Sequence, residues 1–187
     1  MIKSKKLKKF KKIQSIFFNS TGGVSKNIYK SLNCGIGSND KKRNVLKNLK
    51  IVYKKAGIKK NNLVINKQVH SNRIYFVDKI PSTKLIGDGL ITNVKGLGLG
   101  ILTADCAPIF FYDPKNNIIG AAHAGWRGAF KKIVNKMVLK FLKMGSKIKN
   151  LYVVIGPCIS QNNYEVKINF KNKFLRQNRN NNKYFKL

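Results

Sequence analysis

The chain has 187 residues, of which 43% are hydrophobic and 10% aromatic. This length and composition suit one domain with a single core and argue against disorder throughout. Lysine and arginine number 39 against 6 acidic residues, which gives a formal net charge of +33. The excess is almost all lysine and comes with abundant asparagine, a combination typical of A- and T-rich genomes. Nucleic-acid grooves favour arginine, so no specific nucleic-acid partner is predicted. A general RNA- or anion-binding protein stays an alternative that rests on charge alone.

Cysteine usage and apolar content bear on the compartment. The three cysteines, Cys34, Cys106 and Cys158, are odd in number and widely spaced, which argues against a disulfide framework. Residues 1–13 form a basic N-terminal arm in which lysines alternate with single apolar residues, unlike a signal peptide. No apolar run approaches the ~20 residues of a membrane span. The sequence therefore predicts a cytoplasmic protein with no membrane contact.

Short apolar runs and helical spacing predict the elements in chain order. A strand is expected at residues 16–18, followed by turns, and apolar spacing predicts a helix over 44–56 that stops at Gly57. Asp40, just before this helix, is expected to cap it or to interact favourably with its dipole. Short apolar runs then predict several strands, at residues 63–65, 73–77, 90–92, 97–102, 109–112 and 118–122.

The clearest helical pattern follows these strands. Apolar residues at steps of three and four over 130–142, with a stop at Gly145, predict a helix, and 151–155 predict a buried strand. Residues 169–187 form a low-complexity tail in which no element is predicted. Strands with helices at intervals predict an α/β fold, with a mixed sheet covered by helices.

The chain contains only two histidines, His70 and His123, and each stands beside small or polar residues at a predicted strand end. Cys106 lies between them and follows another predicted strand. If the three strand ends converge, two imidazoles and a thiolate face one ion with an open fourth position, as in catalytic zinc sites. A metal site of His70, Cys106 and His123 is predicted. The alternative interpretation is two hydrogen-bonded histidines and a buried structural cysteine.

Three charged neighbours are candidates for supporting roles. Asp105 is predicted to orient a ligand or to act in acid–base chemistry, with a turn residue as the alternative. Arg127, in Gly125-Trp126-Arg127-Gly128, opens the strong helix and suits an oxyanion or phosphate, with a solvated arginine as the alternative. Asp88 lies between two glycines and is interpreted first as a turn former.

Several short motifs of this sequence occur in one order that resembles the laccase-domain family. Members of that family have been called polyphenol oxidases, purine nucleoside phosphorylases and peptidoglycan editing factors. The resemblance runs from about Phe17 to Val166. The motifs are Asn33-Cys34-Gly35, Gln68-Val69-His70-Ser71, Asp88-Gly89-Leu90-Ile91-Thr92, Thr103-Ala104-Asp105-Cys106-Ala107-Pro108, His123-Ala124-Gly125-Trp126-Arg127-Gly128, Ile155-Gly156-Pro157-Cys158-Ile159 and Tyr164-Glu165-Val166.

The resemblance implies a fold and an activity. The fold would be a layered α/β sandwich of mixed β-sheets flanked by helices, in one domain over residues 1–187. The activity would be phosphorolysis of adenosine, inosine and S-methyl-5'-thioadenosine, with adenosine deamination as a companion, so the partners would be purine nucleosides and phosphate. His70, Cys106 and His123 match the family's metal ligands. Gln68 and Asn33 are expected to bind substrate together with Arg127.

The ligand set bears on which metal the site prefers. Two histidines are too few for a multicopper centre, which excludes that oxidase mechanism. A type 1 copper site uses two histidines, a cysteine and a distant methionine, and no methionine lies just beyond Cys106 or His123. Zinc is therefore the predicted metal, and copper is a possible substitute.

The sequence also departs from the family pattern. The usual Asn-Arg pair is replaced by Asn48-Leu49, and the family domain continues past Tyr164-Glu165-Val166, so its C-terminal part is expected to be missing. Three alternatives follow: a Cys–His hydrolase with Cys106 as the nucleophile, a peptidoglycan-editing role, and a degenerate, non-catalytic family member. The chain is expected to be a monomer or a homodimer.

Overall fold

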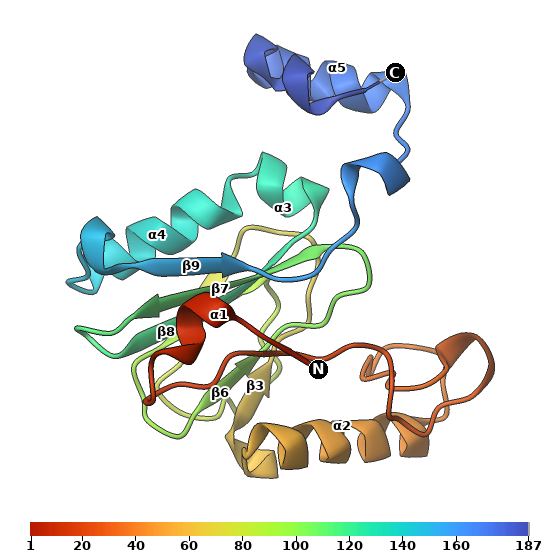
Figure 1. Ribbon diagram of the computed structural model, residues 1–187, viewed down its shortest axis with the longest axis vertical. Helices are drawn as coiled ribbons and strands as arrows, with labels where there is room; N and C mark the ends of the chain where they lie inside the picture. Colours follow the sequence, from red (N-terminus) through yellow and green to blue (C-terminus); the bar gives the residue numbers. More distant parts are fainter. Residues whose placement is uncertain (187) are drawn as a thin grey trace.

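The computed structural model describes residues 1–186 and has a mixed α/β architecture (Figure 1). The strands are β1 (Ile2–Lys3), β2 (Ile16–Phe17), β3 (Leu63–Ile65), β4 (Ile74–Phe76), β5 (Gly89–Thr92), β6 (Gly98–Gly100), β7 (Ala107–Asp113), β8 (Ile118–Ala124) and β9 (Tyr152–Ile155). The α-helices are α1 (Lys5–Lys8), α2 (Lys42–Ala56), α3 (Trp126–Phe130), α4 (Ile133–Lys143) and α5 (Ile168–Gln177). Within residues 1–186, no helix has the length and apolarity needed to cross a bilayer.

A five-stranded sheet in the order β4-β5-β8-β7-β9 organises the chain. Strands β4 and β5 are parallel, whereas the pairs β5–β8, β8–β7 and β7–β9 are antiparallel. Two smaller pairs, parallel β3–β6 and antiparallel β1–β2, complete the strands. Helices α3 and α4 lie on one side of the large sheet, and β3, β6 and α2 lie on the other (Figure 1). The predicted α/β sandwich of mixed sheets flanked by helices is confirmed.

The core lies between α4 and the sheet. Ile133, Met137 and Phe141, spaced at four, recur on one face of α4 and are fully buried. Gly120 of β8 lets this helix approach closely, because a Cβ there would lie 2.8 Å from both Met137 and Phe141 atoms. The buried residues that share this cluster are Ile91, Ile109, Phe111, Ile118 and Ala122.

Two predicted helix boundaries need correction. The helix predicted over 130–142 begins at Ile133, because Lys132 has φ 58° and separates α4 from the short α3 that contains Arg127. Asp40 does not cap α2, since Lys41 is the N-terminal boundary residue and makes no side-chain cap. The predicted stop at Gly57 is confirmed, because its φ of 62° forms the left-handed cap common at helix ends.

The basic N-terminal arm packs against the body of the protein. Ser4 caps α1 by accepting a hydrogen bond from the backbone N–H of Leu7, and Leu7 itself is buried. Phe10 makes edge-to-face contacts with Tyr112 and Tyr152, at centroid distances of 5.1 and 4.8 Å. The arm thus covers one end of the sheet with its few apolar residues.

The tail from residue 169, for which no element is predicted, forms α5 and a 3-10 turn over Arg179–Tyr184. Phe170 and Phe174 lie four residues apart on one face of α5. Phe170 contacts Trp126 at 5.1 Å and Phe174 contacts Phe130 at 5.2 Å between ring centroids. Sparse aromatic residues thus dock this lysine- and asparagine-rich segment on α3.

Asn48 joins α2 to the glycine-rich loop before it. It is fully buried, accepts a hydrogen bond from the Val24 N–H at 2.8 Å, and donates to Ser25 Oγ and to the Ser31 and Asn33 carbonyl oxygens. Both the oxygen and the nitrogen of its side-chain amide are bonded to this loop. Asn48 therefore links α2 to this loop, whereas the departure from the family's Asn-Arg pair falls on Leu49.

Replacing Asn48 with alanine should lower the free energy of unfolding by about 2–4 kcal/mol, because it leaves buried polar groups without partners. Urea unfolding monitored by circular dichroism measures the change. Lys50→Ala, an exposed substitution on the same helix, is the matched control and should stay within about 0.5 kcal/mol of the parent. Equal losses in both variants would contradict the assigned role.

Candidate metal centre

The structure brings the three predicted ligands together from different segments. His123 is in β8, Cys106 directly precedes β7, and His70 lies in the loop between β3 and β4. Strand pairing aligns two of these segments, because Pro108 lies opposite His123 in the β7–β8 register. Metal-ligating atoms of His70, Cys106 and His123 all lie within 4.8 Å of one another. The Cys106 Sγ is 3.9 Å from the His70 Nε2.

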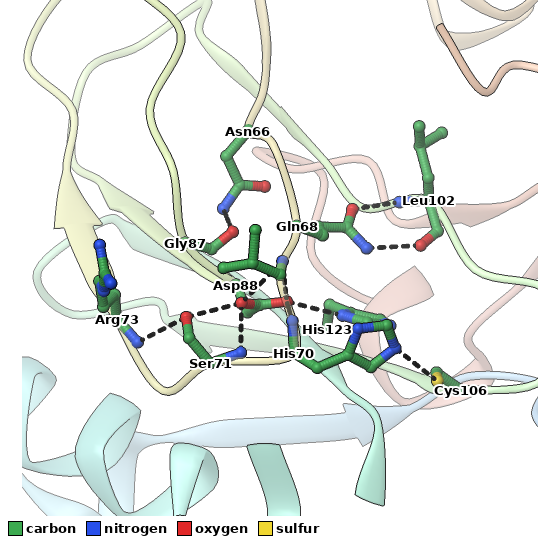
Figure 2. A network of polar contacts seen from close by, with 11 residues as sticks. Asn66, Gln68, His70, Ser71, Arg73, Gly87, Asp88, Leu102, Cys106 and His123 are labelled. Atoms are coloured by element: carbon green, nitrogen blue, oxygen red, sulfur yellow. Dashed lines mark hydrogen bonds and ion pairs between the residues drawn. The ribbon is translucent and has the colours of Figure 1, made fainter. Parts of the chain in front are cut away.

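Asp88 organises this cluster. Its carboxylate contacts His123 Nδ1 at 2.8 Å and is completely buried. The carboxylate partner makes Nδ1 the protonated nitrogen of His123, which leaves Nε2 as the free electron-pair donor. Figure 2 shows the Asp88 carboxylate bonded to His123 and to the backbone of the His70 loop, with Cys106 beside the His70 ring. Asp88 therefore fixes both the tautomer and the orientation of one predicted ligand.

The same carboxylate holds the backbone of the His70 loop. Asp88 oxygens accept hydrogen bonds from the backbone N–H groups of Val69, His70 and Ser71, the last at 2.6 Å, and from the Ser71 hydroxyl. His70 has φ 55°, a left-handed conformation that is uncommon outside glycine and needs such support. One buried acid thus positions both histidines.

Hydrogen bonding determines the charge state of Asp88. Burial alone would raise the pKa of this carboxyl, but hydrogen bonds from Ser71, His123 and Val69 outweigh it and lower the pKa below the ordinary value. Asp88 is therefore ionised at neutral pH and supplies a negative charge beside the cluster. The interpretation of Asp88 as mainly a turn former is wrong.

Gly125 leaves room for the cluster. A Cβ at this position would lie 2.7 Å from His70 Cδ2 and 2.9 Å from Cys106 Sγ. Its φ of −70° is accessible to any residue, so the requirement for glycine is one of space and not of backbone freedom. The backbone of residue 125 forms one wall of the centre.

The surroundings of Cys106 favour the neutral form of its side chain, whereas those of Asp88 favour the ionised form. Burial raises the pKa of its thiol, and the negative charges of Asp105, Asp88 and Cys158 raise it further. A free thiol is therefore favoured at neutral pH in the absence of a cation, and a bound cation would favour the thiolate. This environment suits a metal ligand better than a free nucleophile.

Gln68 and Asn33 have their side-chain amides committed within the protein. Gln68 Nε2 donates to the Leu102 carbonyl at 2.7 Å, and its Oε1 accepts from the Leu102 N–H at 2.8 Å. Asn33 donates to Ser38 and Asp40, and its Oδ1 accepts from the Gly35 N–H. Both residues shape loops, and their roles in substrate binding stay predictions.

Asp105 and Arg127 are exposed residues beside the cluster. Asp105 directly precedes Cys106, and its backbone carbonyl accepts a hydrogen bond from Ile159 N at 2.9 Å. The Arg127 guanidinium lies 5.3 Å from the Trp126 ring centroid, two residues beyond Gly125. Their catalytic roles stay predictions.

Tyr164 is a neighbour that the sequence analysis names only as part of a motif. Burial raises the pKa of its phenol, and so do the charges of Cys106 and Asp105. The Tyr164 hydroxyl is thus close enough to Cys106 and Asp105 for their charges to affect its pKa. A Tyr-Glu-Val motif offers no chemical sign of this proximity, because the contact forms through tertiary folding.

The fold and this centre define a layered α/β protein with a His₂Cys cluster able to hold a metal ion. The sequence profile of the family described as multi-copper polyphenol oxidoreductase laccase matches residues 14–187. The chain belongs to this family. The match extends beyond residue 166 and includes the tail that forms α5.

Individual relatives agree with this assignment. The chain is 36% identical over 166 residues to purine nucleoside phosphorylase YlmD of Bacillus subtilis, covering 83% of this chain and 60% of that protein. It is 38% identical over 149 residues to purine nucleoside phosphorylase RC0672 of Rickettsia conorii, covering 78% and 61%.

Solved structures share the fold. A hypothetical protein YfiH of Bacillus licheniformis superimposes with a TM-score of 0.79 at 34% identity, covering 82% of this chain and 61% of that one. YlmD of Geobacillus stearothermophilus gives 0.79 at 32% identity, covering 84% and 62%. The chain thus spans about three-fifths of the length of these relatives.

Replacing Asp88 with asparagine should weaken zinc binding by about 10–100-fold, because the amide removes the charge and turns a donor toward the loop N–H groups. Competition with a chromogenic chelator measures the affinity. Asp78→Asn, at an exposed acid, is the matched control and should bind zinc like the parent. Parent-like affinity in Asp88→Asn would refute the positioning role.

Replacing Gly125 with alanine should also weaken zinc binding, by about 10-fold or more, because its Cβ displaces His70 or Cys106. Isothermal titration calorimetry with zinc measures the loss. Gly37→Ala is the control, since a Cβ there meets no atom within 4 Å. If the two variants bind zinc equally, Gly125 does not limit the space of the centre.

Proposed function

We propose that this chain is a zinc-dependent purine nucleoside phosphorylase that acts on adenosine, inosine and S-methyl-5'-thioadenosine. The observation that carries the proposal is the convergence of His70, Cys106 and His123 beside a buried, ionised Asp88. The names of the relatives support the choice of reaction. Cytoplasmic location and a monomeric or homodimeric state are part of the same proposal.

Zinc fits the donor set better than copper. Two imidazoles and one thiolate with an open fourth position are a catalytic zinc arrangement, in which the ion acts as a Lewis acid when bound. A type 1 copper site typically adds a distant axial methionine. Met137 is fully buried in the hydrophobic core beneath α4, where it packs against Gly89 and Gly120.

The reaction transfers the sugar from the purine to phosphate. A phosphate oxygen forms a bond to the anomeric carbon of the ribose, and the bond from that carbon to the purine nitrogen breaks. Arg127, exposed two residues from Gly125, is the proposed phosphate ligand, since a guanidinium matches phosphate oxygens in pairs. Asp105 is the group proposed to manage the proton that the departing base takes up.

Gln68 and Asn33 are proposed to take part in substrate binding. Their side chains stabilise the loops that would contact the substrate. The paired bonds from Gln68 to Leu102 fix the segment that leads from β6 to Cys106. Asn33 and Asp40 similarly hold the loop before α2. Adenosine deamination is a proposed companion activity, because a metal ion that acts as a Lewis acid can activate water to attack the purine ring.

A Cys–His hydrolase is the second candidate, and the 3.9 Å contact between Cys106 and His70 favours it. Burial raises the pKa of the Cys106 thiol, whereas a cysteine nucleophile needs it lowered. The phosphorylase proposal therefore takes precedence. Loss of activity on chelation, with recovery on adding zinc, distinguishes the two, since a metal-free hydrolase is insensitive to chelators.

Replacing Arg127 with alanine should raise the KM for phosphate by about 10–100-fold, because a charge-assisted contact is lost. The assay follows release of adenine from adenosine at varied phosphate. Arg176→Ala, at an exposed arginine of α5, is the control and should keep the parent KM. An unchanged phosphate dependence in Arg127→Ala would eliminate Arg127 as the phosphate ligand, and no phosphate-dependent release by the parent chain would refute the phosphorylase proposal.

A further inference from the structure

The pairing of β7 with β9 continues past the ends of both strands. In the strand register Ile109 lies opposite Ile155, and each step along one strand matches one step back along the other. Beyond the paired residues, two backbone hydrogen bonds still join the two segments, from Gly156 N to the Pro108 carbonyl at 2.8 Å and from Ile159 N to the Asp105 carbonyl at 2.9 Å. Cys106 and Cys158 lie in the short stretches between these two bonds, one on each segment.

The flanking hydrogen bonds hold the stretches that carry Cys106 and Cys158 side by side. Neighbouring extended segments joined by backbone hydrogen bonds have Cα atoms about 4.5–5.5 Å apart, and disulfides span Cα distances of about 4.4–6.8 Å. Both are free thiols in this structure, and Cys158 is exposed. The contribution of Cys158 to the raised pKa of Cys106 agrees independently with this proximity.

We propose that Cys106 and Cys158 form a reversible disulfide that removes the thiol ligand from the metal centre. The oxidant is a peroxide. The sulfur of exposed Cys158 attacks one peroxide oxygen, which yields a sulfenic acid and, for hydrogen peroxide, one water. The sulfur of Cys106 then attacks the sulfenic sulfur, and its proton leaves with the hydroxyl group as a second water. A dithiol reverses the reaction by exchange.

Formation of the Cys106–Cys158 disulfide would make metal binding sensitive to oxidation. A disulfide sulfur is no longer a thiolate, so the oxidised chain has only His70 and His123 as ligands. A bound ion engages the Cys106 sulfur and protects it, so metal and peroxide compete for one residue. This consequence rests on the proposed metal site, whereas formation of the disulfide does not.

The experiment treats the purified chain with a small excess of hydrogen peroxide, blocks remaining thiols with N-ethylmaleimide and digests it with trypsin without reduction. Mass spectrometry should find residues 96–115, which contain Cys106, linked to residues 150–167, which contain Cys158. Two of the three thiols should be lost and recovered with dithiothreitol. Cys158→Ser should abolish the linked peptide, and Cys34→Ser, the matched control, should keep it.

A second measurement follows zinc release with a chromogenic indicator during oxidation. Release in step with the linked peptide supports the switch, and zinc added in excess should slow disulfide formation several-fold. Separate oxidation of Cys106 and Cys158 to sulfinic acids, or linkage to Cys34 as often as to each other, would overturn the inference. A linked peptide without zinc release would support the disulfide and count against the metal site, which separates the two failures.

Discussion

The buried carboxylate of Asp88 is the interaction on which the centre depends. It accepts hydrogen bonds from the His123 ring, three successive backbone N–H groups and the Ser71 hydroxyl. These donors come from β8 and from the loop after β3, two segments about 50 residues apart in the chain. A fully buried charge is costly without such partners, so the network must form as a unit.

The sheet provides the geometry in which this carboxylate acts. Asp88 immediately precedes β5, and its carbonyl accepts a hydrogen bond from the His123 N–H at 2.8 Å, in addition to the side-chain contact. The backbone and the side chain of one residue therefore fix the same histidine. Pairing of β7 with β8 then places Cys106 beside it, and Gly125 leaves space for the cysteine sulfur. Small residues at the strand ends are thus as necessary as the ligands.

Much of the fold could be predicted from the sequence. Periodic apolar residues located α2 and α4 because each buries a single face, and short apolar runs located the strands of the large sheet. The helix boundary at Lys132 could not be predicted, because the left-handed conformation of a lysine does not change the spacing of the apolar residues. Helix α5 could not be predicted because its aromatic contacts with α3 come from two residues, Phe170 and Phe174, in a background of lysine and asparagine.

The sequence predicts the three candidate ligands of the site but not the role of Asp88 in positioning them. The rarity of histidine made His70 and His123 conspicuous, and the structure places them with Cys106. The position of Asp88 between two glycines favours a turn and gives no sign of its bond to His123. The sequence offers one useful signal, the scarcity of acidic residues, since the chain has 6 of them against 39 basic residues. The structure shows that Asp88 is completely buried. Its loop partners depend on tertiary contacts that no local pattern encodes.

Elemental analysis of the chain, purified without added metal, tests whether His70, Cys106 and His123 form a metal centre. We expect close to one zinc per chain in the parent protein, and almost none in His70→Ala and Cys106→Ala variants that remain folded. A parent protein without zinc, or variants that retain it, would contradict a metal centre built from these residues.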